Sequence, residues 1–328
     1  KTEAFMANID VKYELWKNKL LDLCKRNRLL NYRETARSSL KIEYPECDAL
    51  WDLFVKEGEP LIFPFEDEEN EDETEGADSD KDEEILIDAG VSLRRLKKTL
   101  EENGLGIDSF SAVLVTHDHA DHVKSVGNLS IDYNLPVYTT GKVHEGIIRN
   151  YCVSKKIPHD NIRVIEKGQT YKIGGFLVTP FEVPHDSSDN VGYRIEAEGV
   201  VFCLITDAGS ITDEMKRQIS EANYLVIEAN HDEEMLECGP YPSHLKKRIL
   251  SNIGHLSNKN CGIVIAENMT EKLRMVWLCH LSEENNHPEL ARKTVESVLK
   301  SYGIIVGKDI QMEVLKRKLP TGLVDLTL

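Results

Sequence analysis

The sequence lacks any run of 18 or more apolar residues, and its first residues, Lys-Thr-Glu-Ala-Phe-Met, form no apolar signal region. Neither a transmembrane helix nor a secretory signal is therefore expected, no membrane partner is predicted, and the predicted location is the cytoplasm. The seven cysteines are scattered, odd in number and without a Cys-X-X-Cys pair. This pattern argues against a disulfide framework, and we expect reduced cysteines in the core.

Acidic residues are abundant but unevenly placed. Residues 66–84 carry 13 acids and one lysine, a net charge of −12 out of −17 for the 328-residue chain. This tract has almost no apolar side chain to offset the entropy of ordering, so it is predicted to be a disordered linker. It separates residues 1–65, where helical periodicity with a basic face predicts a helical appendage, from a larger domain over residues 85–328.

From residue 85 onward, short β-rich runs alternate with amphipathic segments. This mixture predicts a layered α/β domain. The expected strands are 84–90, 112–115, 136–138, 162–165, 176–178, 193–197, 200–205, 225–228, 262–266 and 275–279. The expected helices are 92–103, 122–134, 212–221, 267–273 and 287–302.

The most informative stretch is Thr-His-Asp-His-Ala-Asp-His at 116–122, directly after the apolar run 112–115. His117 and His119 are two residues apart, so both can point to one side of an extended segment. Asp121 and His122 follow as the chain turns away and can face a second point nearby. Imidazole and carboxylate are ligands that zinc, manganese and iron share. The spacing therefore predicts two adjacent metal ions.

Three further candidate ligands, His185, Asp207 and His280, each follow or end an apolar run that reads as a strand. The ends of strands are where α/β sheets gather functional groups. Together with the motif at 116–122, these residues make a shared metal site the preferred interpretation. Asp88, which follows the apolar run 85–87, has the same placement and is expected to orient a ligand from behind.

On these residues the chain resembles metallo-β-lactamase-fold hydrolases, αββα sandwiches with an HxHxDH motif followed by separate His, Asp and His residues after strands. The resemblance implies one metal held by His117, His119 and His185, the other held by Asp121, His122 and His280, and Asp207 bridging the two. Over about 85–328 the chain resembles the YycJ (WalJ) branch, bacterial cytosolic members linked to DNA exonuclease activity. The stretches that carry this resemblance are 114–124, 228–236, 241–242, 254–258 and 280–286.

The chain departs from the family at its start. Family members begin with a strand and a Gly/Ser-rich loop, where this chain has the acidic tract. The domain therefore either lacks its first strand or uses Pro60–Phe65 in its place. Further upstream, Trp16–Asn31 resembles part of an uncharacterised domain at the start of bacterial helicase-like proteins, and no catalytic motif occurs there.

Two adjacent divalent metals suit the hydrolysis of phosphodiesters, thioesters or lactones, and the fold does not choose among them. The branch resemblance favours a phosphodiesterase or DNA exonuclease that uses two zinc or manganese ions and a metal-bridging hydroxide, with DNA as substrate. A thioesterase or lactonase of the glyoxalase II type is one alternative. An interaction protein with a vestigial metal site is another.

The predicted roles extend to residues around the metals. Asp121 is expected to position the hydroxide, and His255 or His231 to protonate the leaving alkoxide or to hydrogen-bond the phosphate. The candidate substrate-binding residues are Lys124, Ser257 and Asn258. Further candidate phosphate contacts are Lys246, Lys247, Arg248 and Arg194.

Overall fold

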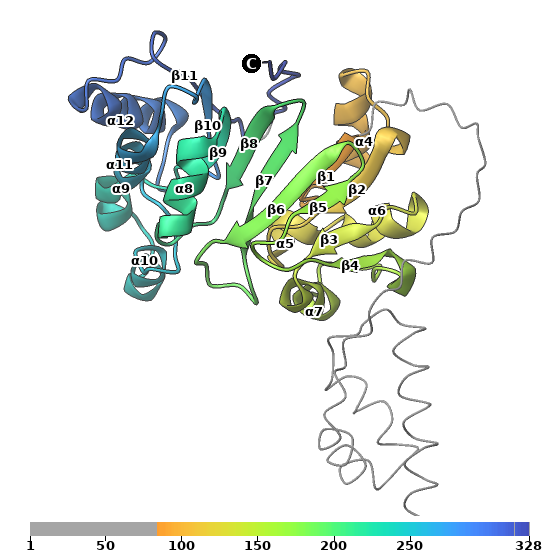
Figure 1. Cartoon of the computed structure of the whole chain (residues 1–328). Helices are drawn as coiled ribbons and strands as arrows, with labels where there is room; N and C mark the ends of the chain where they lie inside the picture. Colours follow the sequence, from red (N-terminus) through yellow and green to blue (C-terminus); the bar gives the residue numbers. More distant parts are fainter. Residues whose placement is uncertain (1–83, 318, 328) are drawn as a thin grey trace, which may run out of the picture. The chain divides into compact units, whose positions relative to one another are not determined.

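The structure is a computed structural model that describes residues 84–317 and 319–327 (Figure 1). The predicted helical appendage at 1–65, the segment Pro60–Phe65 and the acidic tract up to residue 83 lie outside the described residues. The prediction that the tract is a disordered linker and the idea of a substitute first strand therefore stay predictions. The first described residue, Glu84, is also the first residue of a strand.

The described residues form two facing β-sheets. The first has four parallel strands in chain order: β1 (Glu84–Ile87), β2 (Phe110–Leu114), β3 (Val137–Thr139) and β4 (Ile162–Val164). The second has the order β11-β10-β9-β8-β7-β6-β5. Its strands are β5 (Tyr171–Ile173), β6 (Phe176–Glu182), β7 (Val191–Ala197), β8 (Val200–Ile205), β9 (Tyr224–Glu228), β10 (Met275–Cys279) and β11 (Gln311–Val314).

Helices cover the outer face of each sheet (Figure 1). On the first sheet these are α4 (Leu93–Glu102), α5 (Ala120–Val123), α6 (Val126–Asp132) and α7 (Gly141–Arg149). On the second sheet they are α8 (Asp213–Glu221), α11 (Asn258–Asn268) and α12 (Pro288–Ser301). Two short helices, α9 (Glu233–Cys238) and α10 (Ser243–Ile249), and two 3₁₀ turns, Ile107–Ser109 and His159–Asn161, complete the fold. The layers run helix, sheet, sheet, helix, so the predicted αββα sandwich is confirmed.

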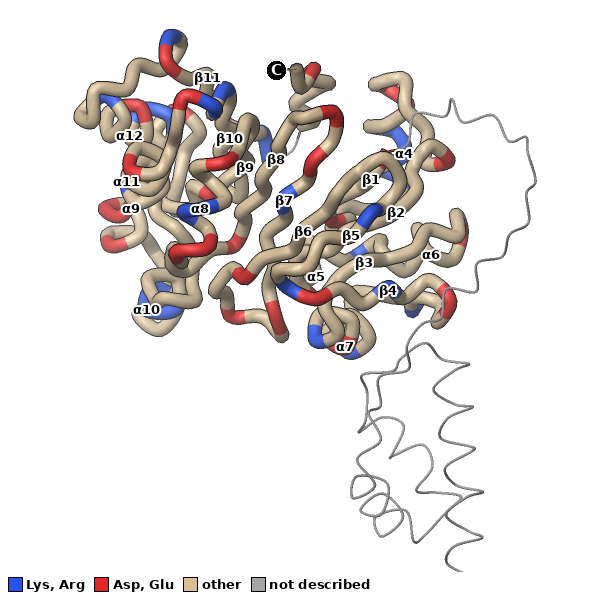
Figure 2. Tube along the Cα trace, viewed as in Figure 1, with Lys and Arg blue, Asp and Glu red and all other residues tan. Residues whose placement is uncertain are grey.

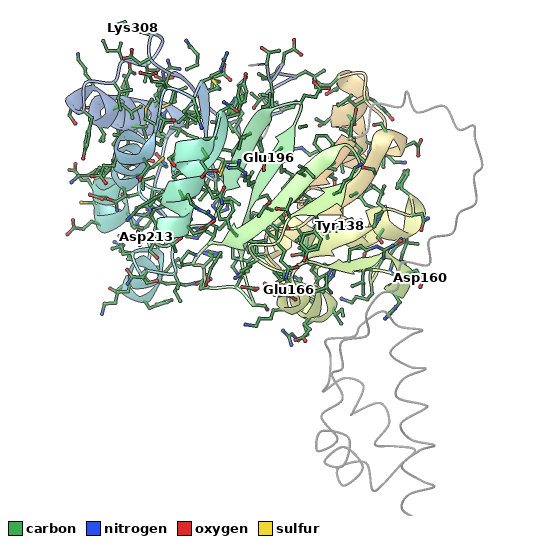
Figure 3. The ribbon with its side chains drawn as sticks, viewed as in Figure 1. Tyr138, Asp160, Glu166, Glu196, Asp213 and Lys308 are labelled. Carbon is green, nitrogen blue, oxygen red and sulfur yellow. The ribbon has the colours of Figure 1, made fainter. Side chains whose placement is uncertain are left out.

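The interior between the sheets is apolar, because the strands present alternate side chains to it. Leu114 of β2 packs there with Val178 of β6. Tyr138 of β3, labelled in Figure 3, packs against the same cluster. Tyr193 of β7 crosses this layer and donates its hydroxyl hydrogen bond to the Val115 carbonyl at 2.6 Å. The second sheet is thereby tied to the segment that leads into the histidine motif.

Two predicted elements are wrong. Residues 262–266 are not a strand but part of helix α11, and the helix expected at 267–273 does not form, because α11 ends at Asn268. The run Gly-Ile-Val-Ile-Ala is apolar throughout, and such a run does not distinguish a buried strand from a buried helix. Gly262 lets α11 approach α12 closely, since a Cβ there would lie 2.9 Å from the Val298 Cβ. Strands β5 and β11 and helices α7, α9 and α10 were not predicted.

The described cysteines are free thiols. Cys203, Cys261 and Cys279 are buried, as predicted, whereas Cys238 is exposed at the end of α9, so for this residue the prediction of a core position is wrong. Within the described ranges, no helix combines the length and the apolar character needed to cross a membrane.

Candidate metal centre

The candidate ligands meet at one edge of the sandwich because of strand direction. In the second sheet β7 runs against β6 and β8, while β8, β9 and β10 are parallel. The carboxyl ends of β6, β8, β9 and β10 therefore lie at the same edge, as do those of the parallel strands β1 and β2 in the first sheet. The residues at or just after these ends are Asp88, His117, His185, Asp207, Glu228 and His280.

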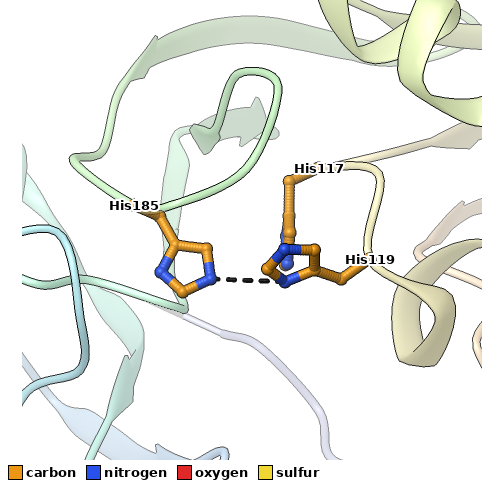
Figure 4. Close-up of side chains that lie close together, drawn as sticks. All are labelled: His117, His119 and His185. Atoms are coloured by element: carbon orange, nitrogen blue, oxygen red, sulfur yellow. Dashed lines mark hydrogen bonds between the residues drawn. The ribbon is translucent and has the colours of Figure 1, made fainter. Parts of the chain in front are cut away.

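The first group consists of three histidines, which Figure 4 shows converging. One ring nitrogen from each of His117, His119 and His185 lies within 4.8 Å of the others. His119 Nδ1 and His185 Nε2 are 3.4 Å apart. His185 Nδ1 lies 3.0 Å from the Gly254 carbonyl oxygen, an acceptor that leaves the other nitrogen free to face the cluster. The expected first ligand set is thus brought together.

The second group consists of Asp121, His122 and His280, whose ligand atoms also lie within 4.8 Å of one another. His122 Nε2 is 3.7 Å from Asp121 Oδ2, and His280 Nε2 is 3.6 Å from the same oxygen. Close packing of the loop after β1 brings the motif into this place. A Cβ on Gly90 would lie 1.4 Å from the Asp121 carbonyl oxygen, so only glycine fits there.

Asp207 lies between the two groups. Its Oδ1 is 3.7 Å from His185 Nε2 and its Oδ2 is 3.4 Å from His122 Nε2, so each group has a ligand beside one carboxylate oxygen. Asp207 and His280, like Asp88, have φ near +55°, the left-handed region that non-glycine residues seldom adopt. Such backbone strain collects at functional sites, where the surrounding structure holds it in place.

Two carboxylates, one half-buried and one fully buried, hold the histidines from behind. Asp88 accepts from His122 Nδ1 at 2.7 Å and from the Thr116 backbone N–H at 2.8 Å, in the orienting position expected of it. Glu228, fully buried at the end of β9, has Oε1 2.8 Å from the Nδ1 atoms of both His255 and His280. Glu228 was not among the predicted site residues. Its position at the end of an apolar run was the available signal.

The loop that carries His185 is fastened to the histidine motif. Asp118, between the first two histidines of the motif, accepts from the Ser188 hydroxyl at 2.7 Å and from the Ser188 backbone N–H at 3.1 Å. Further along, Asp189 accepts from the Thr140 hydroxyl at 2.9 Å and from Lys167 Nζ at 2.6 Å. The Asp118 bonds fix the distance between the two loops that supply the first group, and the Asp189 bonds tie the loop that carries His185 to neighbouring segments.

Burial and charge set the protonation of these groups. Burial lowers the pKa of His117 well below its usual value, and the neighbouring histidines lower it further. Burial also lowers the pKa of His185. Burial opposes the charge on His122, but Asp88 outweighs it and raises the pKa to about 9. Burial likewise opposes the charge on His255, where Glu228 prevails and raises the pKa. Neutral imidazole is the form that binds a metal, so His117 and His185 of the first group are already in their binding state.

The residues fit a pair of metal ions. His117 Nε2 is buried and has no hydrogen-bond partner among the described residues, although the same ring is held at Nδ1 by Thr116. A buried polar atom without a hydrogen-bond partner requires an explanation, and a bound metal ion would be the missing partner of this nitrogen. The histidines and carboxylates around it form a His/Asp metal-binding cluster of the kind that dinuclear sites use.

A pocket of about 380 Å³ opens over this cluster. His255 lines it, with its ring centroid 5.0 Å from that of His185 and 5.3 Å from that of His280. Arg248 of α10 also lines the pocket, whereas Lys124, Lys246, Lys247 and Arg194 do not. Lys246 donates to two backbone carbonyls, and Arg194 pairs with Glu196 and Glu221 on the outer side of the second sheet.

Three other predicted residues lie behind the pocket. Ser257 is buried and caps α11 by accepting from the Asn260 backbone N–H, and its hydroxyl donates to Glu233. Asn258 is buried and exchanges amide hydrogen bonds with Asn286. His231 is 1% exposed and bridges to Ser257 through its backbone. These side chains are buried and none of them lines the pocket. Their predicted contacts with substrate stay predictions, and their placement does not favour them.

Comparison with known proteins identifies the family to which the chain belongs. Residues 83–277 match the model of the beta-lactamase superfamily domain, and residues 19–128 match that of a protein of unknown function, DUF4011. Exodeoxyribonuclease YycJ of Bacillus anthracis is 37% identical over 243 residues, 73% of this chain and 90% of that protein. Exodeoxyribonuclease WalJ of Streptococcus pneumoniae is 33% identical over 228 residues, 70% and 84% of the two chains.

Among solved structures, Zn²⁺-bound PqqB from Methylobacterium extorquens superposes with a TM-score of 0.55 at 18% identity, covering 76% of this chain and 86% of that one. This likeness shows the fold alone. The two exodeoxyribonucleases align over more than two thirds of the chain at 30% identity or better, and the superfamily model covers more than half of it. The chain therefore belongs to the YycJ/WalJ family of the metallo-β-lactamase superfamily.

Proposed function

We propose that the protein is an exonuclease that hydrolyses phosphodiester bonds at DNA ends with two divalent ions, zinc or manganese. The observation that carries the proposal is the convergence of seven ligand side chains beneath one pocket in a chain 37% identical to an exodeoxyribonuclease. The first ion would be held by His117, His119 and His185. The second would be held by Asp121, His122 and His280, with Asp207 shared by both.

Two bound divalent ions supply Lewis-acid polarisation of the phosphate and make water nucleophilic at neutral pH. The protein contributes orientation around them. Asp121, with its side chain 68% exposed at the pocket floor, is the carboxylate that can accept a hydrogen bond from the attacking water and aim it at phosphorus. Attack on the face opposite the leaving oxygen then breaks the phosphorus–oxygen bond.

His255 is the residue that can protonate the leaving oxygen. Glu228 holds its Nδ1 at 2.8 Å, which directs the other nitrogen away from that carboxylate, and the ring lines the pocket. His231 has no comparable placement, because it is buried and does not line the pocket. Between the two histidines considered as proton donors, we therefore assign the role to His255.

The test is hydrolysis by the full chain loaded with zinc or manganese. Labelled single- and double-stranded DNA, bis(p-nitrophenyl) phosphate, a glutathione thioester and a lactone are offered in parallel. We expect DNA to be shortened from an end and the thioester and lactone to survive. His255→Ala should lower the rate on DNA roughly 10²–10⁴-fold, the usual range for a positioned acid, while metal content stays the same.

His159→Ala is the matched control, because His159 is exposed in a 3₁₀ turn outside the pocket, and its rate should equal that of the wild type. Intact DNA combined with rapid turnover of the thioester or the lactone would refute the nuclease proposal in favour of a thioesterase or lactonase. No turnover of any substrate by fully metal-loaded protein would favour a vestigial site.

A further inference from the structure

Two of the metal ligands leave their strands through an unusual backbone conformation. Asp207 comes soon after β8 and His280 directly after β10, and both have a φ of +54°. Away from the metal centre, the described non-glycine residues with positive φ are Asn134 and Glu198, which are exposed, so water can reach their carbonyl oxygens. Asp207 is 1% exposed, so its backbone carbonyl depends on the protein for a hydrogen bond.

An asparagine side chain meets the carbonyl oxygen of each of these two ligands. Asn190 Nδ2 donates to the Asp207 carbonyl at 2.9 Å, and Asn230 Nδ2 donates to the His280 carbonyl at the same distance. Both asparagines are buried, so little water competes for these bonds. Asn190 precedes β7 and Asn230 follows β9. The same contact therefore occurs twice, at two ligands and from two separate segments of the chain.

The backbone that presents each amide is itself held in place. Asn190 forms an isolated antiparallel bridge with ligand His117. Its Oδ1 is buried and has no hydrogen-bond partner among the described residues, so the donated bonds orient this amide. The Asn230 carbonyl accepts from the Ser282 backbone N–H at 2.7 Å and from Asn286 Nδ2 at 2.9 Å. Each donor thus has a fixed position from which to hold its ligand.

The donor is an uncharged amide in both cases. Figure 2 shows charged positions on strands and helices of both layers, so cationic side chains are common in this domain. A lysine or arginine beside two divalent cations would repel them, whereas an amide donates a hydrogen bond without a net charge. The chemistry of the donor therefore suits a place next to metal ions.

We propose that Asn190 and Asn230 are positioning residues that hold Asp207 and His280 in the left-handed conformation in which their side chains face the metals. The inference rests on the metal centre of the proposed function and not on its substrate. A held carbonyl fixes the ψ angle of its residue, and a non-glycine residue keeps this strained conformation only where the surroundings impose it. Without the amide, the peptide plane turns and carries the ligand side chain away from the cluster.

The two asparagines should differ in which ion they affect, because Asp207 lies between the ligand groups while His280 belongs to the second. The experiment titrates the metal-free full chain with zinc and resolves the binding steps by calorimetry. Asn230→Ala should weaken the second ion roughly 10–100-fold, the usual range for a partner behind a ligand, and leave the first within about twofold. Asn190→Ala should weaken both ions by roughly 10–100-fold. The step that Asp121→Asn removes identifies the second ion.

Cobalt(II) in place of zinc gives a second readout, because its visible absorption bands depend on the number and arrangement of the ligands. The bands should change in position or intensity in Asn190→Ala and Asn230→Ala. Asn190→Asp and Asn230→Asp keep the shape of the side chain but lack the donor, and they decide the result if the smaller side chain prevents folding. The added negative charge by itself favours cations, so weaker metal binding by these variants would come from the lost donor.

Asn161→Ala is the matched control. Asn161 is buried and donates to the Ser130 carbonyl at 3.0 Å, but it neither lines the pocket nor belongs to a ligand group. The loss of this bond should lower the stability of the metal-free chain to urea. The affinity for both ions should stay within about twofold of the wild type, which separates positioning of a ligand from the general cost of losing a buried amide.

Three outcomes overturn the inference while the metal centre stands. The first is wild-type affinity for both ions and unchanged cobalt bands in the variants of Asn190 and Asn230. The second is equal weakening of both ions by Asn230→Ala, and the third is an equal loss of metal from Asn161→Ala. A wild-type chain that binds less than one ion refutes the metal centre and the inference with it. If the wild type binds two ions but leaves DNA intact, only the nuclease assignment fails.

Discussion

The two ligand groups of the metal centre differ in their access to solvent. In the first group His117 is 0% exposed and the His185 side chain is 1% exposed. In the second group the side chains of Asp121 and His280 are 68% and 26% exposed. The first ion would therefore be the more enclosed of the two, with only His119 of its own group lining the pocket, while the second would face the pocket through Asp121 and His280. Enclosure favours tight binding and slow exchange, whereas exposure favours contact with substrate.

The groups also differ in how they are supported. The first is held by fastened loops, in which Asp118 and Asp189 fix the chain that carries His185. The second is held by charge, since Asp88 accepts from His122 and Glu228 accepts from His280. Carboxylates behind a ligand raise its basicity as well as orienting it. The second group, which is more open to solvent, is thus the one with the stronger electrostatic support.

The largest expected effect is on metal content. His117→Asn removes the buried ligand of the first group and should weaken binding of the first ion by roughly 10³-fold, a share of the roughly 10–16 kcal/mol that a four-ligand zinc site supplies. Asp121→Asn should leave about one ion per chain but abolish hydrolysis. Elemental analysis after dialysis against a weak chelator, alongside rate measurements, distinguishes the two variants.

The controls for these variants are His159→Asn and Asp160→Asn, exposed substitutions in a 3₁₀ turn that should keep full metal content. Loss of both ions from Asp121→Asn would contradict the proposed difference between the two ligand groups. Retention of two ions per chain by His117→Asn would contradict it equally.

A smaller effect is expected from the carboxylate support. Glu228→Gln keeps the shape of the side chain but removes the charge that both His255 and His280 meet. It should cost roughly 10–100-fold in affinity for the second ion or in rate, the usual range for a partner behind a ligand. Titration calorimetry of the second ion tests this. Glu234→Gln on the exposed face of α9 is the control. A loss confined to the first ion would contradict the division between the groups.

The structure brings the candidate ligands together because they lie at or soon after the ends of strands, or in the turn and short helix that follow β2. The spacing at 116–122, together with His185, Asp207 and His280, required only that parallel strands end at one edge of a sheet. Alternating strands and helices predicted a layered α/β domain. The αββα sandwich was what the resemblance to metallo-β-lactamase-fold hydrolases implied.

Other features depended on packing that a sequence does not display. Glu228 ends an apolar strand much as Asp207 does, but its role depends on two histidines that lie 27 and 52 residues away. Ser257 and Asn258 are polar residues in a stretch that resembles the family, yet they cap a helix and pair with Asn286. Residues 262–266 of helix α11 were predicted as a strand because this short run has no polar side chain to reveal a helical period.

The smallest expected effect concerns a buried histidine that is not one of the candidate metal ligands. His144 of α7 is buried, with Nε2 3.1 Å from the Arg163 carbonyl, and burial lowers its pKa from 6.5 to about 4. The unfolded chain takes up this proton below about pH 6.5, whereas the folded chain stays neutral until about pH 4. Stability from this group is therefore complete above about pH 7 and is lost as the pH falls from 6.5 towards 4.

Between about pH 7.5 and about pH 4.5 the loss should amount to about 2–3 kcal/mol, at roughly 1.4 kcal/mol for each pH unit. His144→Gln keeps an amide donor for the Arg163 carbonyl but does not titrate, so its stability relative to the wild type should rise by this amount as the pH falls. Urea unfolding at the two pH values measures that difference, from which contributions shared by both proteins, including those of the metal ligands, cancel. A difference that is the same at both pH values would mean that burial alone does not keep this histidine neutral. The low pKa of His117 would then have to come chiefly from its crowded ring neighbours, which sharpens the distinction between a ligand group and an ordinary buried histidine.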